Sequence, residues 1–204
     1  MTASTAEMTL PLVIPAATCK NLPPVSAEHT LVAQARAGDG RAFAALVEPH
    51  LGMLYRIAAR ACRDQALAED AVQEALTLAF RRLDRYQPGT SLRAFLATMA
   101  VKQAQTMLRS ERRRRVREDA SASPEYPAGP SDLVEAERTA RRVREVLASL
   151  PKKRQQAALL RLDAGMSYGE IAQAIGTTEG SARVLVHYAL NTLREELKDV
   201  LDGD

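Results

Sequence analysis

The side chains able to ligate metals or attack substrates are few and scattered along this chain. The three histidines, His29, His50 and His187, lie far apart, and none belongs to the HExxH spacing that binds zinc. The two cysteines, Cys19 and Cys62, form neither a CxxC motif nor a disulfide framework. We expect both to be reduced thiols of a cytoplasmic protein. The sequence therefore predicts no enzyme, no metal site and no cofactor.

A different kind of chemistry, electrostatic binding, is concentrated in one segment. Between Arg81 and Arg117 there are 11 basic and two acidic residues, a local balance of +9. Between Asp132 and Asp204 the counts are 11 basic and 12 acidic, and the whole chain of 204 residues carries only +3. Concentrated positive charge is typical of a surface that contacts nucleic-acid phosphates. A solvated helix face is the alternative.

A second binding motif lies near the C-terminus. The spacing of Ser and Glu in Ser167–Glu170 is that of a capping box, which predicts the start of a short helix. Gly176 then predicts a tight turn, and the two threonines that follow it predict the start of a long helix over 179–197. Two helices joined by a short glycine turn are typical of a helix-turn-helix, whose second helix can enter the DNA major groove. Ordinary helix pairing is the alternative.

The elements that position these groups are all predicted to be helices. Apolar residues make up 46% of the chain but aromatic residues only 4%, so the core is mostly Ala, Leu and Val, which suits helices better than sheets. Pro49 is expected to kink or split the second helix. No apolar run approaches the roughly 18 residues that a membrane-spanning helix needs. Apolar periodicity and stop signals predict helices over 26–36, 41–60, 65–82, 92–115, 132–150, 155–164, 168–175 and 179–197.

Proline-rich stretches divide the chain. Residues 1–25 contain four prolines and are predicted to form a mobile N-terminal tail, and residues 119–131 contain three and are predicted to form a flexible linker. The sequence therefore predicts an all-α protein with two small helical domains, residues 26–118 and residues 132–204.

Several short runs occur in order along these two blocks. They are LVAQARAGD at 31–39, AFAALV at 42–47, AEDAVQE at 68–74, SLRAFL at 91–96, LP at 150–151, LLRL at 159–162 and GMSYGEIA at 165–172. Together they resemble the extracytoplasmic-function sigma factors, initiation subunits of bacterial RNA polymerase in the sigma-70 family. The resemblance implies that residues 26–118 are sigma region 2 and that residues 132–198 belong to sigma region 4.

The resemblance implies a polymerase-binding surface on the third predicted helix. Its members lie three and four residues apart, so they project from neighbouring faces of one helix as an acidic and amide patch. In the family this helix docks on a coiled coil of the largest polymerase subunit, where complementary charge steers association. A solvated patch is the alternative. The implied polymerase-binding residues are Glu69, Asp70, Gln73 and Glu74.

The resemblance also implies that the basic fourth helix recognises and melts the minus-ten element. Such a helix must stabilise bases that have left the stack, with a basic groove and a pocket for a flipped base. The chain departs from the family here, because Phe95 replaces the usual tryptophan and Lys102 stands where asparagine is common. Lys102 cannot accept a hydrogen bond from a base, so the minus-ten preference is not predicted. The implied residues are Arg93, Phe95, Lys102, Arg109, Arg112 and Arg113.

The last helix is the implied reader of the minus-thirty-five element, and it is unusually apolar. Val186, Ala189 and Leu193 fall at core positions. Because Arg183 is the only firm cation of this helix face, we expect weak minus-thirty-five binding by the chain alone. Histidine and tyrosine can read base edges and valine can touch a thymine methyl, although the apolar face equally suits a protein partner. The implied residues are Ser181, Arg183, Val184, His187 and Tyr188.

The resulting hypothesis is a non-enzymatic initiation factor that binds core RNA polymerase and promoter DNA. It is expected to be cytoplasmic, to have no membrane insertion, and to be masked by an anti-sigma factor. One alternative is a sigma-like decoy that binds an anti-sigma factor but drives no transcription. The other is a stand-alone helix-turn-helix regulator.

Overall fold

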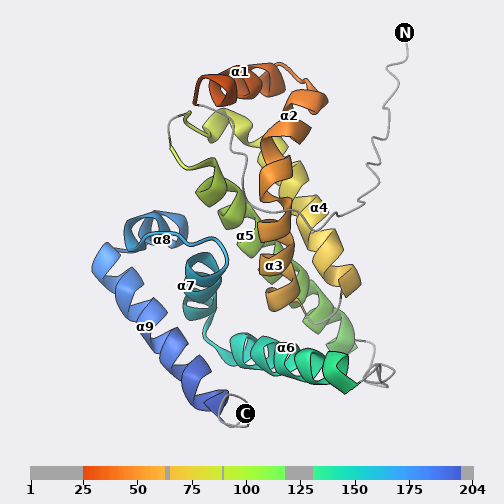
Figure 1. The fold of residues 1–204 in the computed structure, drawn as a ribbon, viewed down its shortest axis with the longest axis vertical. Coiled ribbons are helices and arrows are strands. Elements are labelled where there is room, and N and C mark those ends of the chain that lie inside the picture. The colour runs from red at the N-terminus through yellow and green to blue at the C-terminus, as the bar shows by residue number, and fades with distance from the viewer. Residues whose placement is uncertain (1–24, 63–64, 89, 118–130, 199–204) are drawn as a thin grey trace.

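The computed structural model describes residues 25–62, 65–88, 90–117 and 131–198 (Figure 1). Within these ranges the chain forms helices and no strands, which confirms the all-α prediction. Residues 1–24 of the predicted tail, with Cys19, lie outside the described residues, as do linker residues 119–130 and Gly89, whereas Val25 begins the first helix.

The first block of helices builds one core from closely packed α-helices. Helices α3, α4 and α5 pack against one another, and α1 and α2 lie beyond one end of them (Figure 1). Alanines at the contacts, among them Ala58, Ala71 and Ala100, are fully buried and let the helices approach closely. The elements are α1 (Val25–Arg36), α2 (Gly40–Val47), the 3₁₀ turn η1 (Glu48–His50), α3 (Leu51–Ala61), α4 (Gln65–Arg81), the 3₁₀ turn η2 (Leu83–Arg85) and α5 (Leu92–Arg117).

The helix predicted over 41–60 is split at Pro49, as its sequence indicates. Asp39 begins α2, because its carboxylate accepts hydrogen bonds from the backbone N–H groups of Arg41 at 2.8 Å and Ala42 at 3.3 Å. Pro49 has no N–H to donate, and the chain tightens there into the turn η1 before α3 begins.

A buried tyrosine connects α1 to the loop that precedes α5. The Tyr86 hydroxyl lies 2.5 Å from the Glu28 carboxylate and 2.9 Å from the Thr90 carbonyl. Arg36 donates to the backbone carbonyls of Leu83, at 3.1 and 3.2 Å, and of Tyr86. Burial, together with Glu28, raises the pKa of Tyr86. These bonds fix the start of α5, where the predicted minus-ten residues begin.

The second block consists of α6 (Ser131–Ser149), α7 (Lys152–Leu162), α8 (Tyr168–Ile175) and α9 (Glu179–Glu196). Helices α7, α8 and α9 pack on one another, and α6 contacts α9 and α3. The predicted start of α7 at residue 155 is wrong. The helix begins three residues earlier because the Pro151 carbonyl accepts from the N–H groups of Arg154 at 2.8 Å and Gln155 at 3.0 Å.

Other helix ends differ from the predicted ones by one or two residues. Helices α1 and α6 begin at Val25 and Ser131, so Ser26 lies inside the first turn of α1 rather than at its cap. Differences of this size are ordinary at helix ends, where the last hydrogen bonds fray.

The predicted capping box and glycine turn are confirmed. The Ser167 hydroxyl accepts from the Glu170 N–H at 3.2 Å, and the Glu170 carboxylate accepts from the Ser167 N–H at 2.7 Å. The hydrogen bond from Ser167 N–H lowers the pKa of Glu170. Gly176 has φ +67°, which favours glycine, and Thr178 begins α9 by accepting from the Ser181 N–H at 3.2 Å. These caps fix how α9 leaves α8.

We expect Ser167→Ala to destabilise the second block by about 1 kcal/mol, because it removes the side-chain acceptor at the start of α8. Urea denaturation followed by circular dichroism measures the change. Ser110→Ala, at an exposed position inside α5, is the matched control and should change stability by less than about 0.5 kcal/mol. Equal effects of the two variants would contradict a stabilising role of the cap.

Candidate nucleic-acid and protein interfaces

The predicted polymerase-binding residues lie on the outer side of α4. The opposite side of this helix is buried in the first core through Ala68, Ala71, Val72 and Ala75. Glu69 is half-buried and accepts a hydrogen bond from Gln65 Nε2 at 2.9 Å. The remaining predicted residues are exposed, namely Asp70, Gln73 and Glu74. The four side chains are therefore accessible to a partner along one helix.

The predicted minus-ten residues spread along α5 rather than meeting at one point. Twenty positions separate Arg93 from Arg113, which is about 30 Å of helix. Phe95 is half-buried and packs on Tyr86, with ring centroids 5.6 Å apart. The side chain of Arg112 lies outside the described part of the structure. The exposed cations among the predicted residues are Arg93, Lys102, Arg109 and Arg113.

The α9 face has the orientation that its sequence predicts. Val186, Ala189 and Leu193 are buried in the second core. Val184 and Tyr188 are 52% and 51% exposed, which is unusual for large apolar or aromatic side chains. Ser181, Arg183 and His187 are exposed as well. The predicted minus-thirty-five residues therefore share one solvent-facing surface.

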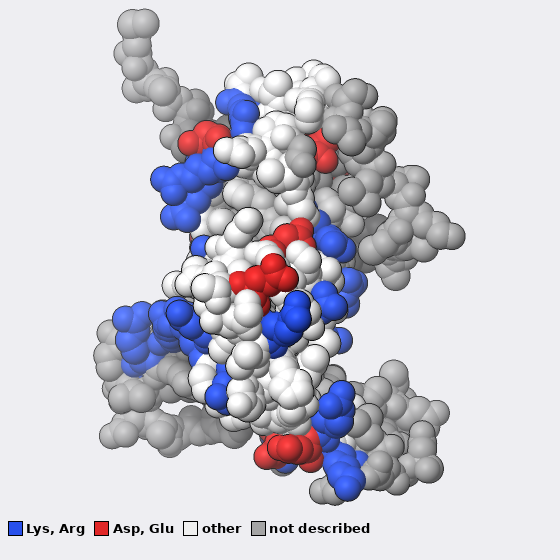
Figure 2. All heavy atoms as spheres, turned by 90° about the vertical axis from the view of Figure 1, so that its left-hand side faces the viewer, with Lys and Arg blue, Asp and Glu red and all other residues white. Residues whose placement is uncertain are grey.

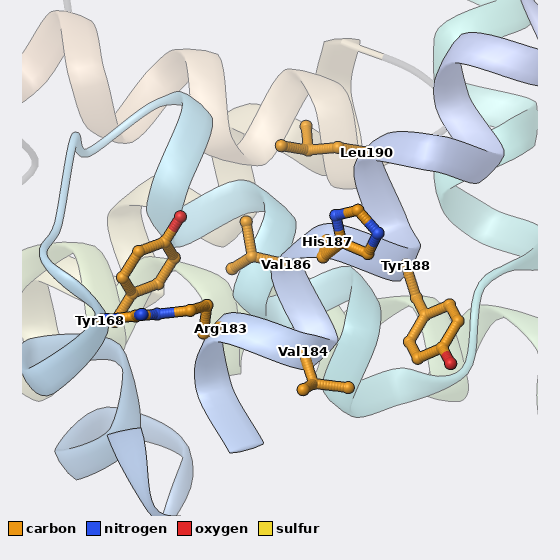
Figure 3. Close-up of a pocket in the computed structure, with 7 residues that line it drawn as sticks. All are labelled: Tyr168, Arg183, Val184, Val186, His187, Tyr188 and Leu190. Atoms are coloured by element: carbon orange, nitrogen blue, oxygen red, sulfur yellow. The ribbon is translucent and has the colours of Figure 1, made fainter. Parts of the chain in front are cut away.

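A shallow hollow of about 500 Å³ lies along this surface, between α8 and α9 (Figure 3). The Arg183 guanidinium lies against the ring of Tyr168 at one side of the hollow, and Val184 and Tyr188 project at the other. The hollow is therefore bordered by apolar and aromatic groups with one guanidinium.

Two further arginines, which the sequence analysis missed, reach this surface from α7. The Arg154 guanidinium lies 5.0 Å from the ring centroid of Tyr188, and that of Arg161 lies 5.0 Å from the ring centroid of Tyr168. Arg183 lies 5.2 Å from the same Tyr168 ring. Such stacking holds a guanidinium in place while leaving its N–H groups available. Their seven-residue spacing places both arginines on the same side of α7, but it does not indicate which helix that side faces.

The basic side chains on the face that carries α8 and α9 form separate groups. Figure 2 shows that uncharged surface and acidic side chains lie between the blue clusters. This distribution agrees with the predicted scarcity of cations on the recognition helix. It differs from the continuous basic stripe that is typical of strong non-specific DNA binders.

Buried amides form part of the contact between the two blocks. Gln105 on α5 is only 5% exposed, and its Nε2 donates to Gln155 Oε1 at 3.1 Å. Gln105 Oε1 accepts from Gln156 Nε2 at 2.9 Å, and Gln105 Nε2 lies 3.4 Å from the Lys152 carbonyl. The contact thus covers one side of α5, beside the exposed cations.

A partly satisfied carboxylate lies at the same junction. The Asp163 side chain is 2% exposed, and one of its oxygens lies 3.0 Å from the Arg60 guanidinium. Its other oxygen, Oδ2, has no hydrogen-bond partner in the described part of the chain. Burial raises the pKa of Asp163, and the charges of Arg60 and Arg56 partly oppose this shift.

The described residues contain neither a metal-binding cluster nor a membrane-spanning helix. Among the described residues, no three His, Cys, Asp or Glu side chains come together in the manner of a metal site. No helix in the same ranges combines the length and apolar composition needed to cross a bilayer.

The raised pKa of Asp163 predicts a pH-dependent stability. A carboxyl group whose pKa is higher in the folded state than in the unfolded state stabilises the folded protein. This contribution is complete when the pH is below the unfolded-state pKa, near 3.9, and it is lost as the pH rises through the folded-state pKa. We therefore expect the free energy of unfolding of the wild type to fall relative to Asp163→Asn as the pH rises above about 4. Urea denaturation at a series of pH values measures the difference.

Arg60→Gln removes the cation that holds the pKa of Asp163 down. In this variant the pH range over which stability falls should therefore extend to higher pH. Arg41→Gln, which removes an exposed cation on α2, is the charge-matched control and should leave the range unchanged. A difference between the wild type and Asp163→Asn that is constant with pH would contradict the prediction.

The chain matches two protein-family models. Residues 46–114 match the model described as Sigma-70 region 2, and residues 140–193 match the model described as Sigma-70, region 4. The first match includes all the predicted residues of α4 and α5, and the second includes all those of α9.

Curated relatives span most of the chain. It is 32% identical over 168 residues to RNA polymerase sigma factor CarQ of Myxococcus xanthus, which covers 81% of this chain and 94% of that protein. It is also 32% identical over 186 residues to ECF RNA polymerase sigma factor SigD of Mycobacterium tuberculosis, with 85% and 84% covered.

Two solved structures are similar to this chain in fold. CnrH, in complex with the cytosolic domain of CnrY, superposes with a TM-score of 0.61 at 25% identity, covering 87% of this chain and 99% of CnrH. The sigma factor RpoE, in complex with the anti-sigma factor NepR from Bartonella quintana, gives a TM-score of 0.56 at 26% identity, with 74% and 94% covered.

Proposed function

Because the chain belongs to the extracytoplasmic-function sigma factors of the sigma-70 family, we propose that its two helical blocks divide the recognition of a promoter. The protein is a sigma factor that directs promoter-specific initiation by RNA polymerase. In this proposal residues 26–118 act as region 2, which binds core polymerase and melts the minus-ten element. Residues 132–204 act as region 4, which contacts the minus-thirty-five element. The chain has no catalytic activity of its own and acts in the cytoplasm with the polymerase.

The polymerase-binding surface is assigned to the outer face of α4. Three of its four polar side chains are exposed, and an acidic surface attracts a basic partner during association. This face points away from the first core, so a partner can bind it without disturbing α3 or α5.

Promoter melting is assigned to α5. Its exposed cations Arg93, Lys102 and Arg109 can follow a phosphate backbone, and the half-buried ring of Phe95 is held by Tyr86 at the start of the helix. Lys102 supplies only donors, so a base at this position is recognised through its acceptors. Because α7 covers the Gln105 side of α5, full access to this helix requires the two blocks to separate.

The observation that carries the proposal for region 4 is the exposed face of α9. The cap of α8 and the turn at Gly176 fix the start of α9, and one side of α9 is buried. Its other side therefore faces solvent with Arg183, Val184, His187 and Tyr188. A helix presented in this way can enter a major groove.

A protein partner that masks these surfaces is also proposed. The exposed Val184 and Tyr188 form the kind of apolar surface that proteins bind. Among the similar structures, RpoE is bound to the anti-sigma factor NepR, and CnrH is bound to the cytosolic domain of CnrY. An anti-sigma factor is therefore the expected partner. The same surface favours the second candidate, a decoy that binds this partner without driving transcription.

Charge reversal on α4 tests the proposed binding of core polymerase. We expect Glu69→Lys with Asp70→Lys to reduce capture of core polymerase and run-off transcription at least about tenfold, since complementary charge becomes repulsive. Pull-down with purified core enzyme measures the first effect.

The control is the double variant Asp84→Lys with Glu195→Lys, which reverses two exposed acids outside α4. It should bind core polymerase as the wild type does. A wild-type chain that binds core enzyme but gives no transcript from any promoter would favour the decoy.

Salt dependence tests the arginines that flank α9. We expect Arg154→Gln and Arg161→Gln each to lower the slope of log affinity against log salt by about 0.9 for duplex promoter DNA, because each removes one phosphate contact. Fluorescence anisotropy with the full chain measures the slope.

Arg141→Gln, at an exposed position on α6 where the side chain pairs with Glu145, removes the same charge and should leave the slope unchanged. Thermal unfolding checks that Arg161→Gln stays folded, because Arg161 also donates to the Met166 carbonyl at 2.8 Å. Equal slopes in all three variants would rule out a role of α7 in DNA binding.

A further inference from the structure

Three polar side chains form a row along the exposed side of α9. Arg194 Nη1 donates to Asn191 Oδ1 at 3.3 Å, and Asn191 Nδ2 lies 3.0 Å from His187 Nε2. Residues 187, 191 and 194 are spaced four and three apart, so they follow one another on the same side of the helix. His187 also lies beside Tyr188, with ring centroids 6.1 Å apart (Figure 3). The row therefore ends in a ring that belongs to the proposed DNA-reading surface.

The hydrogen-bonding capacity of each group fixes the proton on the histidine. An arginine side chain has only donors, so the atom of Asn191 that faces Arg194 must be the amide oxygen. The amide nitrogen then faces His187, and it can only donate. His187 Nε2 must accept this bond and carries no proton in the row. The neutral ring therefore has its proton on Nδ1, which makes Nδ1–H a donor.

We propose that Asn191 is a positioning residue that makes His187 a hydrogen-bond donor, through Nδ1–H, to a base edge in the minus-thirty-five element. In the major groove guanine offers O6 and N7, adenine offers N7 and thymine offers O4 as acceptors, whereas cytosine offers only its amino donor. His187 therefore selects against cytosine at the base that it faces. This inference rests on the proposed binding of α9 to duplex DNA. It adds that His187 is the donor, and the base the acceptor, in the hydrogen bond between them.

The tautomer itself is measured first, without DNA. Nitrogen-15 NMR of the full chain, labelled at histidine, distinguishes a protonated ring nitrogen from an unprotonated one. In the neutral ring of His187 we expect Nε2 to be unprotonated and Nδ1 to be protonated. Asn191→Asp places an acceptor against Nε2 and should move the proton there, and Asn191→Ala should give a mixture of the two tautomers.

Thr192→Val is the matched control on the same helix. It removes the hydroxyl that donates to the Tyr188 carbonyl at 3.0 Å but leaves the row intact, so the His187 signals should stay those of the wild type. A wild-type ring protonated on Nε2, or an Asn191→Ala spectrum identical to that of the wild type, would overturn the inference.

The base preference is measured second, with core polymerase and the full chain on a promoter library randomised in the minus-thirty-five element. At one base pair, we expect the wild type to disfavour cytosine by about 3- to 10-fold, the value of one neutral hydrogen bond. Asn191→Ala should lose most of this preference, as His187→Ala does, while Thr192→Val keeps it.

The outcomes separate the inference from the proposed function. If the wild type shows no base preference in this element and α9 variants change nothing, the proposed reading of DNA by α9 fails, and the base selection falls with it. If the wild type has a preference that His187→Ala removes but Asn191→Ala retains, the positioning role of Asn191 alone is overturned.

Discussion

The buried seam of α9 against α7 and α8 determines most of what this chain can do at its C-terminal end. Ala182, Val186, Ala189 and Leu193 occupy this seam and are buried, so the rotation of α9 about its own axis is fixed. Each residue turns a helix by about 100°, and a rotation of that size would expose Val186 and bury a polar group. The same packing brings α7 beside α9, which is why Arg154 can stack on Tyr188.

The contact between the two blocks adds buried amides and a carboxylate to apolar packing, since the buried apolar residues of both blocks form one cluster. The Gln105 amide is hydrogen-bonded on both its oxygen and its nitrogen, so its burial is compensated. These amides would exchange their bonds for bonds to water on separation, at a small net cost. Asp163 is held less well, since only Arg60 pairs with it and Oδ2 is unsatisfied within the described residues.

Features set by neighbouring residues could be predicted from the sequence, and those set by packing between helices could not. The capping box at Ser167, the turn at Gly176 and the split at Pro49 depend on local backbone chemistry, and all three predictions are confirmed. The stacking of Arg154 and the pairing of Gln105 join helices far apart in the chain, and no local pattern indicates such partners. The roles assigned to the residues of α4, α5 and α9 stay predictions.

The division of charge between the blocks has a consequence for how this sigma factor selects promoters. Phosphate contacts position a protein but carry no sequence information, and the cations proposed to make them are concentrated in α5. The face of α9 offers instead a histidine, a tyrosine and a valine with few cations, groups that discriminate between bases but hold DNA weakly. Such a helix needs no strong affinity of its own. If α4 anchors the chain to polymerase as proposed, α9 is presented to DNA at a high effective concentration, and weak contacts would then suffice to select. Selection by hydrogen bonds of fixed polarity, rather than by charge, also makes the choice of base less sensitive to salt than the binding itself.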